Sequence, residues 1–374
     1  MKVSLPTFLA IGWAWLPFAR AQDAAEKPAK EPLVEIALLD APAATAAAIA
    51  GLKAEGFRGV ALLLDERLTA AEHELAAKLI AKASLDLYYW IEVGRNPQLA
   101  EAHPRWMASL GMHNDWQKGF PNVPLPKEGE VAKAFPWVPI WYQEAFDAHL
   151  RRIEQLLQRA SPTYRGLFLN DLQGGPSSCG CGNLQCRWAT DYRVPATGTK
   201  LTGDDAAGRF VAAVRQQTRK EIIPVWTTEC EEGDLPAKQR PAARSTGKCG
   251  TVGCAAGTCP KAFSRQWSAL VRAHHGAIAL LGLHHELNRT DAELGEGPEW
   301  VAQTVAYLDS LPPQNDGLVA GQFSHGNLWL VVQGVTREEE STARRAAIRS
   351  GAGGVVVARA RIDQTFEPRL LPVK

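Results

Sequence analysis

The chain has 374 residues, of which 41 are Lys or Arg and 40 are Asp or Glu, so its formal net charge is +1. Nucleic-acid binding would need basic side chains gathered on one face, and no basic stripe is present. We therefore expect no nucleic-acid partner. Beyond the first 21 residues no apolar segment approaches membrane-spanning length, so we expect a soluble mature protein without a stable membrane anchor.

The N-terminus has the pattern of a secretory signal peptide. A basic residue precedes an apolar stretch over 3–19, and an A-x-A pattern ends at Ala21. The alternative is a membrane anchor, which Pro6 and Pro17 disfavour because they interrupt a short apolar stretch. We expect cleavage near Ala21, a polar linker over 22–32, and a secreted or periplasmic protein.

Apolar runs of strand length alternate with helical patterns along the rest of the chain, which is typical of a parallel sheet covered by helices. The predicted strands are 33–39, 59–64, 85–93, 165–171, 221–228, 277–283, 328–333 and 354–358, with 318–322 as a competitor for the seventh. The predicted helices are 42–55, 70–83, 142–159, 204–219, 263–274, 299–310 and 337–349. Eight units predict one α/β domain over 33–374, a (β/α)8 TIM-like barrel with long loops after strands three, four and five.

Two local signals support the first helices. Pro42 falls in the first predicted turn, where a missing N–H does no harm. Thr69 precedes the second helix and suits an N-cap.

The ends of the predicted strands are rich in acids. In a barrel of this kind catalytic groups lie at the C-terminal ends of the strands. The residues there are Asp40, Asp65, Glu92, Arg95, Asn170, Asp171, Glu229, His285, Glu286 and Gln333. Two carboxylates flanking a glycosidic bond are the minimum apparatus for glycoside hydrolysis, and Asp171 and Glu229 end consecutive strands.

Structural roles are the alternatives for these acids. Asp171 and Glu229 could cap a turn or the next helix. Asp40, Asp65 and Glu66 shortly precede helix starts, where carboxylates are favoured, and this role is the expected one for them. Glu92 could pair with Arg95 at the rim, and Glu286 competes for the role of the acid.

Tryptophans cluster near predicted loops and strand ends. They are Trp90, Trp106, Trp116, Trp137, Trp141, Trp188 and Trp226. Aromatic faces stack on sugar rings, although single Trp residues are often core or loop anchors.

All seven cysteines fall in the loops after strands four and five: Cys179, Cys181, Cys186, Cys230, Cys249, Cys254 and Cys259. In a secreted chain they first indicate disulfides. The alternatives are a structural zinc site, with Cys179, Cys181 and Cys186 joined by Cys230 or Cys254, and a reactive thiol. No cofactor is expected for catalysis.

Histidines suggest a different class of function, a metal-dependent hydrolase. His284, His285 and Glu286 could bind a metal with His325 or His113. The first predicted strand lacks the His-x-His pair that such barrels usually use.

Three short motifs within 85–235 carry a resemblance. They are HPRW at 103–106, a helix followed by GLFLND at 166–171, and CGCGNLQC at 179–186. Their order resembles the glycoside-hydrolase-like barrels related to the alpha-amylase and alpha-galactosidase superfamilies, particularly secreted bacterial members. The resemblance implies that Asp171 takes the position of the nucleophile.

We therefore predict a secreted barrel that acts on carbohydrate as a glycosidase. Asp171 is the predicted nucleophile or transition-state stabiliser, and Glu229 the general acid and base. The predicted sugar-binding residues are Glu92, Arg95, His103, Trp106, Asn170, Trp226, His285 and Glu286. The alternatives are a non-catalytic carbohydrate-binding or scaffold protein on a degenerate barrel, and the metal hydrolase.

Overall fold

The computed structural model of the chain describes residues 33–110, 120–172, 203–227, 276–282, 327–334, 336–349, 351–360, 362 and 366–373. By contacts the chain divides into residues 1–32 and residues 33–374, and only the second unit contains described residues. The predicted signal peptide and linker lie outside the described residues and stay predictions. No helix in the described ranges is long and apolar enough to cross a membrane.

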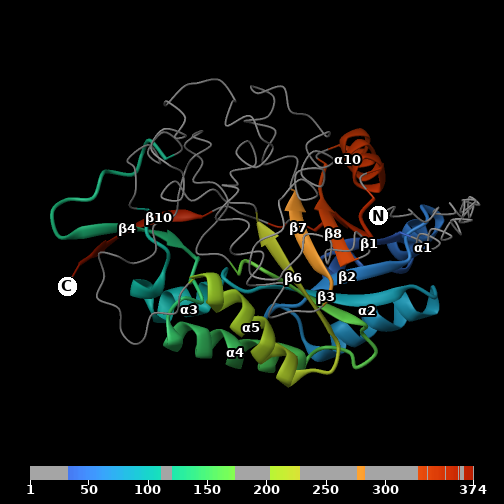
Figure 1. The fold of residues 1–374 in the computed structure, drawn as a ribbon, viewed down its shortest axis with the longest axis horizontal. Helices are drawn as coiled ribbons and strands as arrows, with labels where there is room; N and C mark the ends of the chain where they lie inside the picture. Colours follow the sequence, from blue (N-terminus) through green and yellow to red (C-terminus); the bar gives the residue numbers. More distant parts are fainter. Residues whose placement is uncertain are drawn as a thin grey trace, which may run out of the picture. The chain divides into compact units, whose positions relative to one another are not determined.

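Eight parallel strands close into a barrel in the order β1-β2-β3-β5-β6-β7-β8-β9 (Figure 1). They are β1 Val34–Leu39, β2 Gly59–Leu63, β3 Asp86–Glu92, β5 Gly166–Asn170, β6 Glu221–Thr227, β7 Ile278–Gly282, β8 Leu328–Val332 and β9 Gly354–Ala358. The predicted (β/α)8 fold is confirmed. The seventh barrel strand is β8, and the competing range 318–322 lies outside the described residues.

Aromatic side chains from β3, β5 and β8 meet in the apolar interior of the barrel. Trp90 of β3 stacks on Phe168 of β5 with ring centroids 5.5 Å apart, and Tyr88 meets Trp329 of β8 edge-on at 6.0 Å. Gly354 makes room for this packing, because a Cβ there would lie 2.2 Å from the Trp329 ring. The barrel therefore has a solid apolar centre rather than a pore.

Five helices of the described ranges pack their apolar faces on the outside of the strands (Figure 1). They are α1 Ala46–Ala54, α2 Ala70–Lys82, α4 Gln143–Leu157, α5 Gly203–Gln217 and α10 Arg337–Arg349, whereas the short α3, Pro97–Ala102, packs in a separate small cluster with Met107 and Val138. Phe146 of α4 meets Phe210 of α5 edge-on at 5.1 Å. The predicted helices 263–274 and 299–310 fall outside the described residues.

The predicted start of α2 is confirmed, and the predicted start of α1 is wrong. Thr69 caps α2 in a capping box with Glu72, whose carboxylate accepts from the Thr69 N–H in return. Pro42 instead belongs to a short 3-10 helix, Ala41–Ala43, and α1 begins only at Ala46 with Thr45 as its N-cap. The Thr45 hydroxyl accepts from Ala48 N–H, which lets it start the helix after Pro42.

A small antiparallel sheet outside the barrel was not predicted. Strand β4, Glu130–Phe135, lies in the segment after β3 and pairs with β10, Glu367–Pro372, near the C-terminus. Lys133 of β4 is fully buried, and its ammonium donates to the carbonyls of Arg105 and Met107 at 3.1 and 2.7 Å. These bonds tie the preceding loop to the small sheet.

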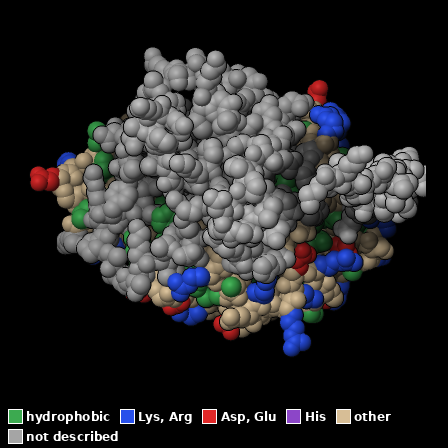
Figure 2. Space-filling view, in the orientation of Figure 1, with side chains coloured by type: hydrophobic (Ala, Val, Ile, Leu, Met, Phe, Trp, Pro, Cys, Tyr) green, Lys and Arg blue, Asp and Glu red, His purple; other side chains and the backbone are tan. Residues whose placement is uncertain are grey.

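Basic side chains do not gather into a stripe on the face drawn in Figure 2, where the described Lys and Arg side chains are scattered. This distribution agrees with the near-neutral charge of the sequence.

Candidate functional site

Polar side chains replace the apolar filling at the C-terminal end of the barrel. Strand side chains alternate, so the inward position at each strand end lies two residues beyond the last apolar inward residue. The interior residues Leu38, Leu63, Trp90, Phe168 and Val331 are followed in this way by Asp40, Asp65, Glu92, Asn170 and Gln333. The sequence pattern had placed all five at strand ends.

Glu92 is held in place by two donors. Its Oε1 accepts from the indole N–H of Trp90 at 2.8 Å, and its Oε2 accepts from Nδ2 of Asn170 at 2.8 Å. Glu92 and Asn170 are partners in the β3–β5 register. Among the described residues, Glu92 and Arg95 form no ion pair, so the alternative of a Glu92–Arg95 pair is wrong. The Trp90 indole and the Asn170 amide bind the Glu92 carboxylate instead.

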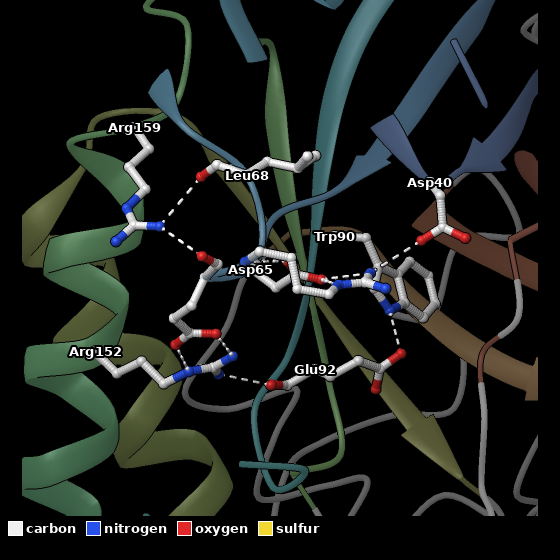
Figure 3. A network of polar contacts seen from close by, with 9 residues as sticks. Asp40, Asp65, Leu68, Trp90, Glu92, Arg152 and Arg159 are labelled. Carbon is white, nitrogen blue, oxygen red and sulfur yellow. Dashed lines mark hydrogen bonds and ion pairs between the residues drawn. The ribbon is translucent and has the colours of Figure 1, made fainter. Parts of the chain in front are cut away.

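A second polar group spans the ends of β1 and β2. The Arg67 guanidinium donates to Asp65 Oδ2 at 2.7 Å and to Asp40 Oδ1 at 3.1 Å (Figure 3). The hydrogen bond to Asp65 is the main cause that raises the pKa of Arg67, which burial opposes. Asp40 does stand at a helix start, as the N-cap residue of the 3-10 helix Ala41–Ala43, but its side chain makes no cap hydrogen bond and binds Arg67. For Asp65 the expected helix-start role is wrong, because Thr69 caps α2 and Asp65 binds Arg67.

Helix α4 fixes the end of β3 and the loop after β2 (Figure 3). Arg152 donates to both carboxylate oxygens of Glu66, at 2.5 and 3.1 Å, and to the Glu92 carbonyl at 2.8 Å. Arg159 donates to the carbonyls of Glu66 and Leu68. Burial raises the pKa of Glu66, but the hydrogen bonds and charge of Arg152 outweigh it and hold this pKa below its usual value. The expected helix-start role of Glu66 is therefore wrong.

Sequence reasoning missed Arg67, Arg152 and Arg159. Arg67 follows two acids in a loop, which is a weak local signal for a bridge between strand ends. Arg152 lies on α4 and Arg159 in the turn directly after this helix, and arginines at such positions are common on solvated helix surfaces.

Asp171 directly follows β5 and is fully buried. Its φ of 60° lies in the left-handed region, which is uncommon for a residue with a side chain. Gly94 allows the close approach, since a Cβ there would lie 2.8 Å from the Asp171 carbonyl oxygen. The inward strand-end position on β5 therefore belongs to Asn170. Glu229 lies outside the described residues, so the Asp171 and Glu229 pair stays a prediction.

The remaining predicted binding residues on the described ranges lie in the segment after β3. His103 stacks on Trp106 with ring centroids 3.8 Å apart, and Trp106 packs against a small apolar cluster containing Met107 and Val138. Arg95 forms an isolated β-bridge with Trp137, and its Nε is buried without a partner in the described part of the chain.

Three of the seven predicted tryptophans lie in the apolar clusters or pack against them. Trp90 and Trp137 are buried in apolar clusters, and Trp141 is half-buried against the outer core. For these three the anchor role is confirmed. Trp226 lies in β6, where only its strand pairing with Leu280 is described, and Trp116 and Trp188 lie outside the described residues.

Several predicted groups fall outside the described residues: His113, Cys179, Cys181, Cys186, Cys230, Cys249, Cys254, Cys259, His284, His285, Glu286 and His325. Disulfides, the zinc site and the histidine metal site therefore stay predictions. Within the described ranges, no group of three or more His, Cys, Asp or Glu side chains could hold a metal ion.

The fold and the strand ends define the class as a TIM barrel with a polar C-terminal mouth. No family model matches the chain, and no curated protein matches it. Solved structures similar to it include a tryptophan synthase from M. tuberculosis (12% identity, TM-score 0.33, covering 88% of this chain and 83% of that one). They also include an HpcH/HpaI aldolase from Desulfitobacterium hafniense (10%, 0.32, 87% and 86%) and an alpha-amylase from Lactobacillus plantarum (9%, 0.40, 89% and 72%). At these identities and TM-scores, the similarities support no statement about activity.

Proposed function

We propose that the chain binds a carbohydrate at the C-terminal end of the barrel and cleaves it as a glycosidase. The observation that carries this proposal is the Glu92 carboxylate, held by Trp90 and Asn170 above an aromatic interior. A carboxylate and an amide fixed beside aromatic rings suit a sugar, which offers hydroxyl donors and apolar ring faces.

In this proposal Asp171 and Glu229 carry the chemistry. One carboxyl group protonates the leaving oxygen, and the other attacks the anomeric carbon or activates a water molecule. Glu92, Asn170, Arg95 and His285 orient the sugar hydroxyls. The chemistry needs no cofactor, and a zinc ion held by Cys179, Cys181, Cys186 and Cys230 would have a structural role only.

The test is hydrolysis of a panel of polysaccharides and aryl glycosides by the mature protein. Asp171→Asn and Glu229→Gln should each lower turnover of a confirmed substrate by about 10²-fold or more. Asp147→Asn is the matched control, because Asp147 lies on α4 and its carboxylate accepts from Gln143 of the same helix. Full turnover by Asp171→Asn would show that the mechanism is wrong.

A second candidate is a non-catalytic carbohydrate-binding protein. Complete burial of Asp171 in a left-handed turn favours it, because such a carboxylate suits a turn as well as catalysis. This candidate predicts measurable glycan binding without turnover, with affinity unchanged in Asp171→Asn. Loss of turnover to a chelator would instead point to the metal hydrolase.

A further inference from the structure

Two amide oxygens at the mouth of the barrel have no hydrogen-bond donor among the described residues. Asn170 is fully buried, and neither its Oδ1 nor the buried Oε1 of Gln333 has a partner in the described part of the chain. Buried polar atoms in folded proteins are nearly always hydrogen-bonded, so each such atom needs an explanation. One explanation is that a ligand supplies the missing donors.

The orientation of the Asn170 amide is fixed by its neighbour. Glu92 Oε2 lies 2.8 Å from Nδ2, and an ionised carboxylate can only accept hydrogen bonds. The NH₂ group must therefore face Glu92, and Oδ1 is left pointing away from it. Trp90 donates to the other oxygen of Glu92 and holds that carboxylate in turn.

The second oxygen lies across the barrel. Gln333 follows β8, which is three strands from β5 in a closed barrel of eight, so the Gln333 position lies well around the mouth from Asn170. Tyr88, Phe168 and Trp329 meet in the interior beneath these strand ends. The two unmet acceptors therefore lie on different sides of one mouth, above an aromatic floor.

The helix start after the seventh strand does not suit a phosphate group. Phosphate sites in such barrels are often built from the loops after the seventh and eighth strands, and here α10 starts after the seventh strand, β8. At this helix start Thr336 and Glu339 bind one another. The Thr336 hydroxyl accepts from the Glu339 N–H, and the Glu339 carboxylate accepts from the Thr336 N–H. Glu338, Glu339 and Glu340 place three carboxylates in its first turn. They would repel a phosphate.

Three arginines in the described part of the chain are already paired with carboxylates. Arg67 binds two carboxylates, Arg152 binds Glu66, and Arg359 binds Glu55 and Glu340. The buried Nε of Arg95 presents one donor, and a hydroxyl oxygen can accept it.

We propose that the mouth binds an uncharged, hydroxyl-rich ligand, with Asn170 Oδ1 accepting from one ligand hydroxyl and Gln333 Oε1 from another. Glu92 is the residue that positions the Asn170 amide. This inference rests on the proposed function and narrows its substrate class to neutral glycans rather than sugar phosphates.

The test is isothermal titration of the mature protein with maltotetraose, cellotetraose, xylotetraose and mannotetraose, and with glucose 6-phosphate and inorganic phosphate. At least one neutral tetrasaccharide should bind. Asn170→Ala should weaken it by about tenfold or more, the loss expected for one hydrogen bond to a buried acceptor. Gln217→Ala is the matched control, because this exposed amide of α5 donates only to Leu150 of α4 in the described part of the chain.

Glu92→Gln is the second variant if Asn170→Ala does not fold. A Gln amide can donate to Asn170 Oδ1, so the Asn170 amide becomes free to turn and affinity should fall. Unchanged affinity in both variants would overturn this inference while leaving the proposed function standing. Displacement of the sugar by phosphate or glucose 6-phosphate at lower concentration would also overturn it. Absence of both binding and hydrolysis of every neutral glycan would overturn this inference and the proposed function together.

Discussion

The two described sides of the barrel mouth differ in how their polar groups are satisfied. On the side of β1 and β2, Arg67 neutralises Asp40 and Asp65, with 69% of the Arg67 side chain and 36% of the Asp40 side chain exposed. On the side of β3 and β5, Glu92 and Asn170 bind one another, and Asn170 is buried with its oxygen unmet in the described part of the chain. On the first side Arg67 binds both carboxylates. On the second side Asn170 Oδ1 can still accept a hydrogen bond.

This difference separates a supporting role from a binding role. Exposed ion pairs stabilise proteins weakly and need no ligand. A buried oxygen without a hydrogen-bond donor costs stability and needs an explanation, of which a bound ligand is one. We therefore infer that ligand binding depends on the β3 and β5 side, and that the β1 and β2 side closes the rim.

The largest effect on the β3 side is expected from acid. His149 of α4 is fully buried and donates through Nε2 to the Val138 carbonyl, while Val138 N–H donates to the Gly94 carbonyl after β3. Burial lowers the pKa of His149 to about 3, against an ordinary value of 6.5. Below pH 6.5 the unfolded chain binds a proton that the folded chain does not, so stability falls as pH falls, by up to about 1.4 kcal/mol per pH unit.

Urea denaturation of the wild type and of His149→Phe between pH 7.5 and pH 4.5 checks this prediction. The variant should show a smaller fall. Burial also lowers the pKa of His73, which contributes in the same direction in both proteins. Equal slopes for the two proteins would mean that His149 does not set the acid sensitivity.

Arg152→Ala should weaken both sides of the mouth together. The substitution removes the guanidinium that binds the partly buried Glu66 carboxylate and the Glu92 carbonyl. We therefore expect a loss of about 2 kcal/mol in the free energy of unfolding. Chemical denaturation measures it, with Arg151→Ala, an exposed neighbour on the same helix, as control. A loss no larger than that of the control would show that the contact of α4 with the mouth is dispensable.

Glu92→Ala should affect the β3 and β5 side alone. It removes the acceptor of the Trp90 indole and of the Asn170 amide, so we expect a loss of about 1–3 kcal/mol in stability and a loss of glycan affinity. Thermal unfolding and titration with the glycan that binds the wild type measure the two effects. Unchanged binding would place the ligand elsewhere.

Arg67→Ala should have the smallest effect. Because the Arg67 side chain is largely exposed in both ion pairs, we expect a loss of no more than about 1 kcal/mol in stability, which shrinks at high salt, and unchanged glycan affinity. Denaturation at two salt concentrations and the same titration check both points. A loss of affinity comparable to that of Glu92→Ala would remove the distinction between the two sides.

Much of the fold could be predicted because its signals are local. Eight apolar runs bounded by turn residues marked the barrel strands, and Thr69 with Glu72 marked a helix start. The sheet of β4 and β10 escaped prediction, since its partners lie far apart in sequence and each strand is short.

The sequence by itself determined the number of strands, the barrel class and the polar residues at the strand ends, because these follow from periodicity and from the order of residues along each strand. Only the tertiary structure decided which of these side chains meet. The β3–β5 register sets Asn170 against Glu92, Arg67 joins two strand ends, and Arg152 reaches them from a helix outside the barrel. Such contacts depend on register and packing between distant segments, which no local pattern encodes.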